Sequence, residues 1–259
     1  MLQIIIYVQL SLLFILTSQA RAETLNIASD IWCPYICDND KEPGILVEIL
    51  NEIAKVKKMT IHFETIPLSR SLILASRSEV DVVLAITESH AFDYKLQRSR
   101  EYYGGWQNDF YISSKSGWNS NKLEDLEDFF KVGETLGIIK GYEYGIVIDN
   151  LTLKYATNIF QATGNSPLAK NIKMLQKGRI SALLDSRYNV EYKIKKNSIV
   201  DIIHAGSEGG FVPLFLGYSP TIAPEIIKNI DNGLLLIRSN GILIKILAKY
   251  GVPDWQQPI

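Results

Sequence analysis

Apolar and polar residues recur at two spacings along this chain, one typical of strands and one typical of helices. Residues 25–28 alternate as a strand does, whereas residues 44–58 place apolar side chains three and four positions apart, with polar side chains between them. Residues 60–64 predict a second strand, 68–76 a short helix and 80–86 a largely apolar third strand. Such repeated strand and helix units indicate an α/β fold, with a parallel sheet covered by helices on both faces.

The pattern breaks after residue 87 and then starts again. Residues 88–100 are polar, and residues 101–111 gather aromatic side chains and glycines, which we interpret as a first crossing between two lobes. Three glycines predict a second crossing near residues 204–211. The remaining spacing predicts strands at 110–115, 135–139, 180–185, 199–203 and 211–218, helices at 123–130, 143–156, 165–177 and 186–196, and two closing helices within 224–250.

The N-terminus predicts a secretory signal peptide. Residues 4–16 are nearly unbroken apolar sequence, too short to span a bilayer comfortably, and Ala20 and Ala22 fit the small-x-small cleavage rule. Residues 1–22 are therefore expected to be removed after Ala22, during export through the inner membrane. Because residues 1–3 lack Lys and Arg, an uncleaved membrane anchor is the alternative.

The charge of the chain argues against a polyanionic partner. Its 27 Lys and Arg nearly cancel its 28 Asp and Glu, which gives a formal net charge of −1. No broad positive field is expected that would attract nucleic acid. The residues that follow the signal peptide suffice for one large domain or two lobes with a sizeable core.

The two cysteines, Cys33 and Cys37, are expected to form a disulfide, because their number is even and the predicted export takes them to an oxidising compartment. Their spacing is not that of a redox Cys-x-x-Cys motif. His62, His90 and His204 lie far apart in the sequence, and no phosphate loop or nucleophile elbow is present. We therefore expect no metal, no cofactor and no catalytic residue.

Residues 29–37 are predicted to form one wall of a ligand cleft. They lie between the first strand and the first helix, and in open α/β sheets ligands bind at the loops that follow the carboxyl ends of strands. Trp32 and Tyr35 offer flat apolar faces with a polar group, and Pro34 stiffens the turn between them. The alternative is that the two aromatic side chains merely cover the core.

Six short stretches follow one another in the order of a known family. They are residues 32–35, 44–50, 78–83, 123–126 with 133–141, 177–182 with Asp185, and 232–241. In this order, and with these residue types, they resemble the periplasmic solute-binding proteins of the polar amino-acid type, family 3. The resemblance extends over residues 25–250.

The resemblance implies the type II periplasmic-binding-protein fold, with two α/β lobes, each a mostly parallel sheet flanked by helices, joined by two crossover strands. Lobe 1 would comprise residues 23–108 and 207–259, and lobe 2 residues 109–206. A small polar solute, amino-acid-like or a small organic acid or amine, would bind in the cleft as the lobes close like a hinge. The implied protein is a periplasmic monomer without enzymatic activity that serves an ABC permease or a membrane sensor.

Positions that match the family also imply a set of ligand contacts. Aromatic side chains would enclose the ligand, Arg70 could pair with an anionic group, and Asp185 could accept from an amine. Plainer interpretations are a solvated helix charge for Arg70, a helix N-cap for Asp185 and an ordinary strand end for Thr87. The implied contacts are Trp32, Tyr35, Arg70, Thr87, Gly141, Tyr142 and Asp185.

One position departs from the family pattern. Amino-acid binders of this family carry a Thr-x-x-x-Arg element after the third strand, whose Arg holds the α-carboxylate. Here Thr87 is followed by no Arg at that position, and His90 lies nearby instead. This departure argues against a standard L-amino acid, unless Arg70 or Arg98 supplies the positive charge.

Two alternative functions stay open at this point. Some relatives with this fold are dehydratases that act on prephenate-like acids, and incubation with prephenate would test that activity. A binding module could also present its ligand to a membrane sensor instead of a transporter, and the neighbouring genes would distinguish the two.

Overall fold

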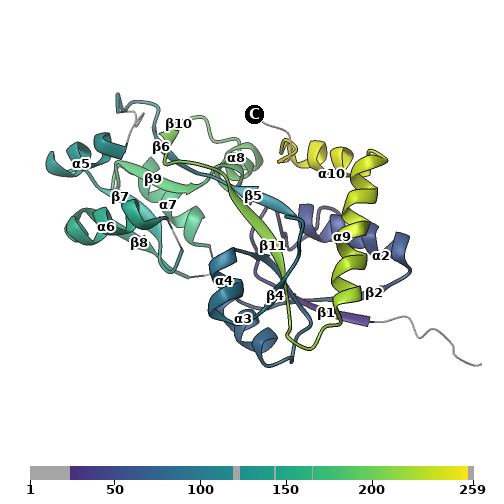
Figure 1. Ribbon diagram of the computed structural model, residues 1–259. Helices are drawn as coiled ribbons and strands as arrows, with labels where there is room; N and C mark the ends of the chain where they lie inside the picture. Colours follow the sequence, from purple (N-terminus) through teal and green to yellow (C-terminus); the bar gives the residue numbers. More distant parts are fainter. Residues whose placement is uncertain (1–23, 119–122, 143, 165, 256–259) are drawn as a thin grey trace, which may run out of the picture.

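The protein folds into two α/β lobes, each built around one sheet (Figure 1). The structure is a computed structural model that describes residues 24–118, 123–142, 144–164 and 166–255, so the predicted signal peptide lies outside it. The first lobe contains β1 (Thr24–Ser29), α2 (Ile45–Lys57), β2 (Thr60–Thr65), α3 (Leu68–Ser76), β3 (Val82–Ile86), α4 (Glu88–Asp93), β4 (Gln97–Arg98), β5 (Gly104–Trp106), β11 (Val212–Tyr218), α9 (Pro224–Ser239) and α10 (Ile242–Tyr250). The second lobe contains β6 (Asn108–Ser113), α5 (Leu123–Lys131), β7 (Leu136–Ile139), α6 (Ile146–Lys154), the 3-10 turn η1 (Ala156–Asn158), β8 (Ile159–Ala162), α7 (Pro167–Gln176), β9 (Ala182–Ser186), α8 (Arg187–Lys196) and β10 (Ile202–Ser207).

The first sheet is mixed. Its strands lie in the order β2-β1-β3-β11-β4, and β5 pairs with β11 as well. β1 is parallel to β2 and β3, as the strand and helix units predict, but β11 is antiparallel to β3, β4 and β5. The expected mostly parallel sheet is therefore corrected to a mixed one, because β11 enters from the second lobe, at the end where β1 and β3 finish.

The second sheet repeats this arrangement. Its order is β10-β6-β9-β7-β8, with β7 parallel to β8 and β9, and β6 antiparallel to β9 and β10. The antiparallel strands again adjoin the crossings, since the chain enters this sheet through β6 and leaves it through β10. The connections between the two sheets are short: Gln107 on the way out and residues 208–211 on the return.

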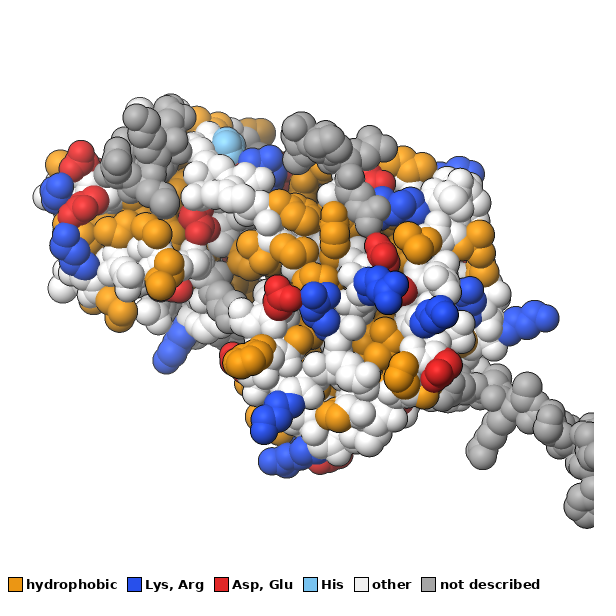
Figure 2. Space-filling model, viewed as in Figure 1, with side chains coloured by type: hydrophobic (Ala, Val, Ile, Leu, Met, Phe, Trp, Pro, Cys, Tyr) orange, Lys and Arg blue, Asp and Glu red, His pale blue; other side chains and the backbone are white. Residues whose placement is uncertain are grey.

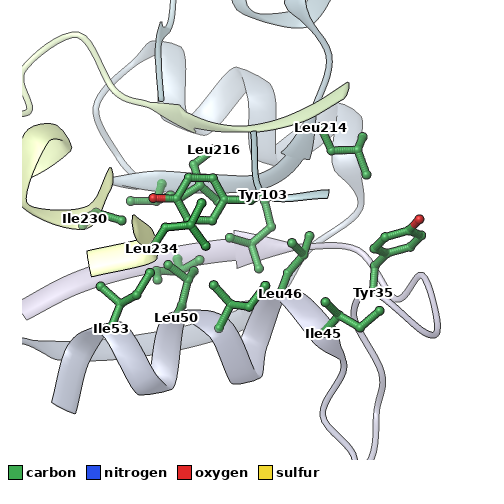
Figure 3. Close-up of a cluster of buried hydrophobic side chains, with 14 of the residues drawn as sticks. Tyr35, Ile45, Leu46, Leu50, Ile53, Tyr103, Leu214, Leu216, Ile230 and Leu234 are labelled. Carbon is green, nitrogen blue, oxygen red and sulfur yellow. The ribbon is translucent and has the colours of Figure 1, made fainter. Parts of the chain in front are cut away.

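Helices cover both faces of each sheet. One face of α2 carries Leu46, Leu50 and Ile53, which point toward Leu216 of β11 and Leu234 of α9 (Figure 3). The other face of the first sheet packs against α3 and α4. In the second lobe, α5 and α6 cover one face, and α7 and α8 cover the other. Burial of large apolar side chains, worth about 1.5–3 kcal/mol each, provides each lobe with its own core.

Four short elements have no clear signal in the residue spacing: α4, β4, β5 and β8. The first of these is a six-residue helix in polar sequence, and the three strands have two to four residues each. The helix predicted at 143–156 begins later, at Ile146, because Gly145 takes a φ of +83° and ends the preceding loop. The strand predicted at 199–203 is β10, which starts at Ile202.

The surface has no large patch of one charge on the face shown in Figure 2, where basic and acidic side chains are interspersed. This distribution agrees with the net charge of −1. Among the residues that the structure describes, no helix is both long enough and apolar enough to cross a membrane.

Candidate ligand cavity between the lobes

A cavity lies between the two lobes, where β1, β3, β7 and β9 end. It encloses about 810 Å³ of empty space, counting the solvent at its mouth. Because the carboxyl ends of parallel strands in both sheets face it, loops from both lobes form its wall. The wall consists of Ser29, Asp30, Ile31, Trp32, Ile36, Leu68, Leu84, Ala85, Thr87, His90, Trp106 and Leu214 from the first lobe, and Asn108, Gly141, Tyr142, Asp185 and Ser186 from the second.

The loop after β1 is a tight and well-bonded turn. The Trp32 N–H donates to the Ile36 carbonyl at 2.7 Å, and the Ile36 N–H donates to the Trp32 carbonyl at 3.0 Å. The predicted disulfide between Cys33 and Cys37 is confirmed and spans the same turn. The first turn of α2 donates further N–H groups to carbonyls of the loop. Covalent and backbone bonds therefore hold the turn that carries Trp32.

The aromatic residues of this loop have different places. The rings of Trp32 and Tyr35 stack with centroids 4.6 Å apart, but Trp32 lines the cavity whereas Tyr35 is fully buried beneath it. The Tyr35 hydroxyl donates to the Gly105 carbonyl, and burial raises the pKa of this phenol. Trp106, at the first crossing, meets Trp32 edge to face at 6.5 Å and joins it on the wall. Two indole rings thus form the aromatic part of the first-lobe wall.

An irregularity in β3 turns two successive side chains toward the cavity. Between its pairs with Phe215 and Gly217 of β11, β3 carries one extra residue. Ala85 takes a φ of +58° there, a left-handed conformation that costs a residue with a Cβ roughly 1–2 kcal/mol. As a result Leu84 and Ala85 both line the cavity, whereas successive residues of a regular strand face opposite sides.

Thr87 caps α4 at the cavity wall. Its hydroxyl accepts from the His90 N–H at 3.3 Å, and its own N–H donates to His90 Nδ1 at 3.2 Å. This reciprocal pair satisfies two backbone donors at the start of the helix. Both residues line the cavity, so the predicted strand end is also a helix start, and the side chain of His90 forms part of the cap.

Asp185 brings a buried carboxyl group to the opposite wall. It lies near the end of β9 and is 1% exposed. Its Oδ1 accepts from the Ser186 N–H at 2.7 Å, while its Oδ2, like the Ser186 hydroxyl, has no hydrogen-bond partner within the described chain. Burial raises the pKa of this carboxyl to about 7, against the opposing effect of the Ser186 N–H. The arrangement leaves one oxygen able to receive a donor from a ligand.

Tyr142 and Asp30 lie near the same point of the cavity. Tyr142 follows β7, and its N–H donates to the Ile139 carbonyl at 3.3 Å. Gly141 precedes it with a φ of +86°, a conformation that favours glycine. Burial and the carboxylates of Asp185 and Asp30 raise the pKa of the Tyr142 phenol, so this hydroxyl stays protonated at neutral pH. The site therefore combines two acidic groups with a phenol.

Five of the seven sequence-predicted contacts lie on the cavity wall, and Tyr35 and Arg70 do not. Arg70 is exposed on α3, although Leu68 at the start of the same helix does line the cavity. Trp106 and Ser186 are wall residues that sequence reasoning did not single out. The described residues include no group of three or more His, Cys, Asp or Glu placed to hold a metal ion.

The two lobes also touch beside the cavity. With its amide oxygen turned toward the indole, Asn189 of α8 accepts from Trp32 Nε1, and its amide nitrogen donates to the Cys33 carbonyl at 3.3 Å. Asn189 is buried, and Tyr188 next to it packs against the core of the first lobe. A second-lobe helix is thus bonded to the first-lobe loop that carries Trp32.

Comparison with solved structures identifies the fold. The probable amino-acid ABC transporter extracellular-binding protein YtmK from Bacillus subtilis is 17% identical with a TM-score of 0.72, over 89% of this chain and 98% of that one. An ancestral arginine-binding protein bound to arginine is 16% identical with a TM-score of 0.71, over 89% and 98%. A histidine kinase sensor domain with similarity to periplasmic binding proteins is 19% identical with a TM-score of 0.71, over 90% and 97%.

These likenesses establish that the chain has the two-lobed periplasmic-binding-protein fold, which confirms the fold expected from the sequence. No protein-family model matches the chain, and no curated protein matches it at the sequence level. The similar structures are binding and sensor proteins. A fold alone does not fix a function, which depends on the residues of the site.

Proposed function

We propose that this protein is a solute-binding protein of the family 3 type, which holds a small solute with an ammonium or guanidinium group in the cavity between its lobes. One observation supports this above all: Asp185 lies on the cavity wall with one buried carboxyl oxygen that has no partner among the residues the structure describes. A buried polar group without a partner costs free energy. A charge-assisted hydrogen bond from a ligand would remove that cost, and Trp32 and Tyr142 would supply flat faces beside it.

We propose that the lobes close about the two crossings, with the predicted bounds of 23–108 with 207–259 and of 109–206 adjusted by one residue at each crossing, because Asn108 begins β6 and Ser207 ends β10 in the second sheet. Gly209 and Gly210 lie in the return crossing, where an added Cβ would meet nothing within 4 Å, so the backbone angles there have room to change. Gly105 differs, because the ring of Phe211 occupies the place of its absent Cβ. The return crossing is therefore the better candidate for the moving segment.

Export and delivery form the finer part of the proposal. The apolar run at residues 4–16 and the cleavage rule at Ala22 support export to the periplasm. Likeness in fold to a binding protein named as extracellular and as part of an ABC transporter supports delivery to a permease. We further propose that the protein acts as a monomer. We propose no catalytic activity.

Delivery to a membrane sensor is the second candidate, favoured by the likeness to the histidine kinase sensor domain. The same cavity would serve either partner. The neighbouring genes distinguish the two: a permease and an ATPase support uptake, and a sensor kinase supports signalling.

A thermal-shift screen of the mature protein, residues 23–259, tests the binding proposal. Amino acids, amines, organic acids and sugars are the compounds to include. A compound present at one hundred times its dissociation constant should stabilise the fold by about 2.7 kcal/mol, which gives a clear shift in Tm. No shift with any compound would contradict the proposal, and turnover of prephenate would support the dehydratase alternative instead.

A further inference from the structure

The charged groups on the cavity wall are acidic. Asp30 and Asp185 contribute two carboxyl groups, whereas the wall residues that the structure describes include no Lys and no Arg. His90 brings an imidazole, but its Nδ1 accepts the Thr87 N–H in the helix cap. A nitrogen that accepts a hydrogen bond in this way is not a donor to a ligand. The wall therefore offers a ligand negative charge without a matching positive one.

Two arginines close to the wall along the chain, Arg187 and Arg98, are bonded elsewhere, whereas Arg70 is exposed on α3, two residues after Leu68. Arg187 follows Ser186, but its Nε pairs with the buried carboxylate of Asp109. Arg98 donates to Glu88 at 3.0 Å, and its guanidinium lies 4.3 Å from the centre of the Phe215 ring. To reach the cavity, either guanidinium would have to give up these bonds.

Two backbone N–H groups at the start of α4 are also occupied. The N–H groups of Thr87 and His90 form the reciprocal cap described above, so neither is available to an anion. Across the cavity, the Ser186 N–H already donates to Asp185. These three donors, placed at strand ends where a carboxylate could be received, are satisfied by the protein itself.

The remaining features of the wall suit a cation. The rings of Trp32, Trp106 and Tyr142 present faces that attract an ammonium or guanidinium group. Asp185 Oδ2 and the Ser186 hydroxyl are acceptors without partners in the described chain, and both are buried at the wall. Two unpartnered acceptors and three aromatic rings on one wall suit a positively charged group.

We infer that the solute is an organic cation without a carboxylate, such as a primary amine or a guanidine, and not the corresponding amino acid. This inference rests on the proposed function and narrows the class of its ligand. The carboxylate of an amino acid would lie in a cavity that also holds Asp30 and the buried Asp185, with no cation on the described wall to pair with, and an unpaired charge beside other negative groups is unfavourable.

Isothermal titration calorimetry with matched pairs tests the inference: agmatine with arginine, cadaverine with lysine, and histamine with histidine. Each pair differs by the carboxylate alone. At least one amine should bind at least tenfold more tightly than its amino acid. Asp185→Asn should weaken that binding at least tenfold, whereas Asp93→Asn, the same substitution at an exposed position on α4, should leave it unchanged.

Two results would overturn the inference. An amino acid that binds as tightly as its amine would show that the cavity accepts a carboxylate, and the proposed solute binding would stand. If Arg70→Ala then no longer bound the amino acid, Arg70 would be identified as the cation that pairs with the carboxylate of the amino acid. If no amine binds, the inference fails, and the wider thermal-shift screen then decides separately whether the proposed function fails too. Thermal unfolding of each variant establishes that it is folded.

Discussion

Asp185 is expected to destabilise the unliganded protein and to bind the ligand, and one substitution separates these effects. Burial raises the pKa of its carboxyl from 3.8 to about 7. The folded protein therefore holds a proton that the unfolded chain has lost, and stability falls as the pH rises from about 4 to about 7. Asp185→Asn should raise the free energy of unfolding at pH 8 by on the order of a few kcal/mol, and by much less at pH 4.5.

Urea unfolding of both proteins without ligand, at the two pH values, measures this difference. The charged groups around Asp185 include Asp30 across the cavity and Asp109, its partner in the pairing of β6 with β9. The carboxylate of Asp109 in turn contacts Arg187 and His204. Wild type and variant share these groups, so their titration cancels in the comparison. A variant less stable than wild type at pH 8 would contradict the assigned state of the carboxyl.

At the same scale, the sequence predicts wall residues that lie at, or within three residues of, the end of a strand with a clear apolar pattern. Thr87, Tyr142 and Asp185 are of this kind, and all three lie on the cavity wall. Leu84 and Ala85 could not be predicted together, because the extra residue in β3 is set by pairing with a strand more than a hundred residues away. Trp106 depends likewise on the pairing of β5 with β11.

Among the elements, the loop between β1 and α2 is expected to depend on its disulfide. Closing so short a loop should stabilise the fold by about 2 kcal/mol in the chain-entropy model. Replacing both Cys33 and Cys37 by Ser should lower the free energy of unfolding by that amount and also weaken ligand binding, because Trp32 would lose its fixed position. Denaturant unfolding and calorimetry measure the two effects. Two free thiols in the denatured, unreduced wild-type protein would contradict the pairing.

Helix α8 is expected to hold the lobes together beside the cavity. Asn189→Ala removes the hydrogen bonds to Trp32 and Cys33, and a net loss of about 1 kcal/mol should weaken ligand binding about fivefold. Asn197→Ala, which removes a bond to Lys193 at the other end of the same helix, should leave affinity unchanged. Calorimetry with the tightest-binding compound compares them. Equal affinities for both variants would show that the contact does not contribute to closure.

The longer elements could be predicted well from the sequence, and the shorter ones could not. Helix α3 is predicted with its observed bounds, Leu68–Ser76, because its apolar residues follow the helical period. Helix α4 is short and begins with a side-chain cap in polar sequence, so it has no apolar stripe to reveal it. The antiparallel course of β6 and β11 depends on how the chain crosses between lobes, which local spacing does not encode.

For the whole molecule, the central claim is that a small solute binds between the lobes and that the lobes close around it. Two separate cores joined by two short crossings allow each lobe to move as a unit. The affinity for the ligand, to which Asp185 contributes, and the closure of the lobes should therefore be linked. The ligand gains contacts with both lobes only in the closed state.

Small-angle X-ray scattering of the mature protein, with and without a saturating concentration of the tightest-binding compound, tests this claim most directly. Calorimetry on the same samples verifies binding. We predict that the radius of gyration of the wild type falls when the ligand binds, and that Asp185→Asn needs a ligand concentration at least tenfold higher for the same fall. A wild-type radius that stays unchanged while the ligand is bound would contradict closure of the lobes around it.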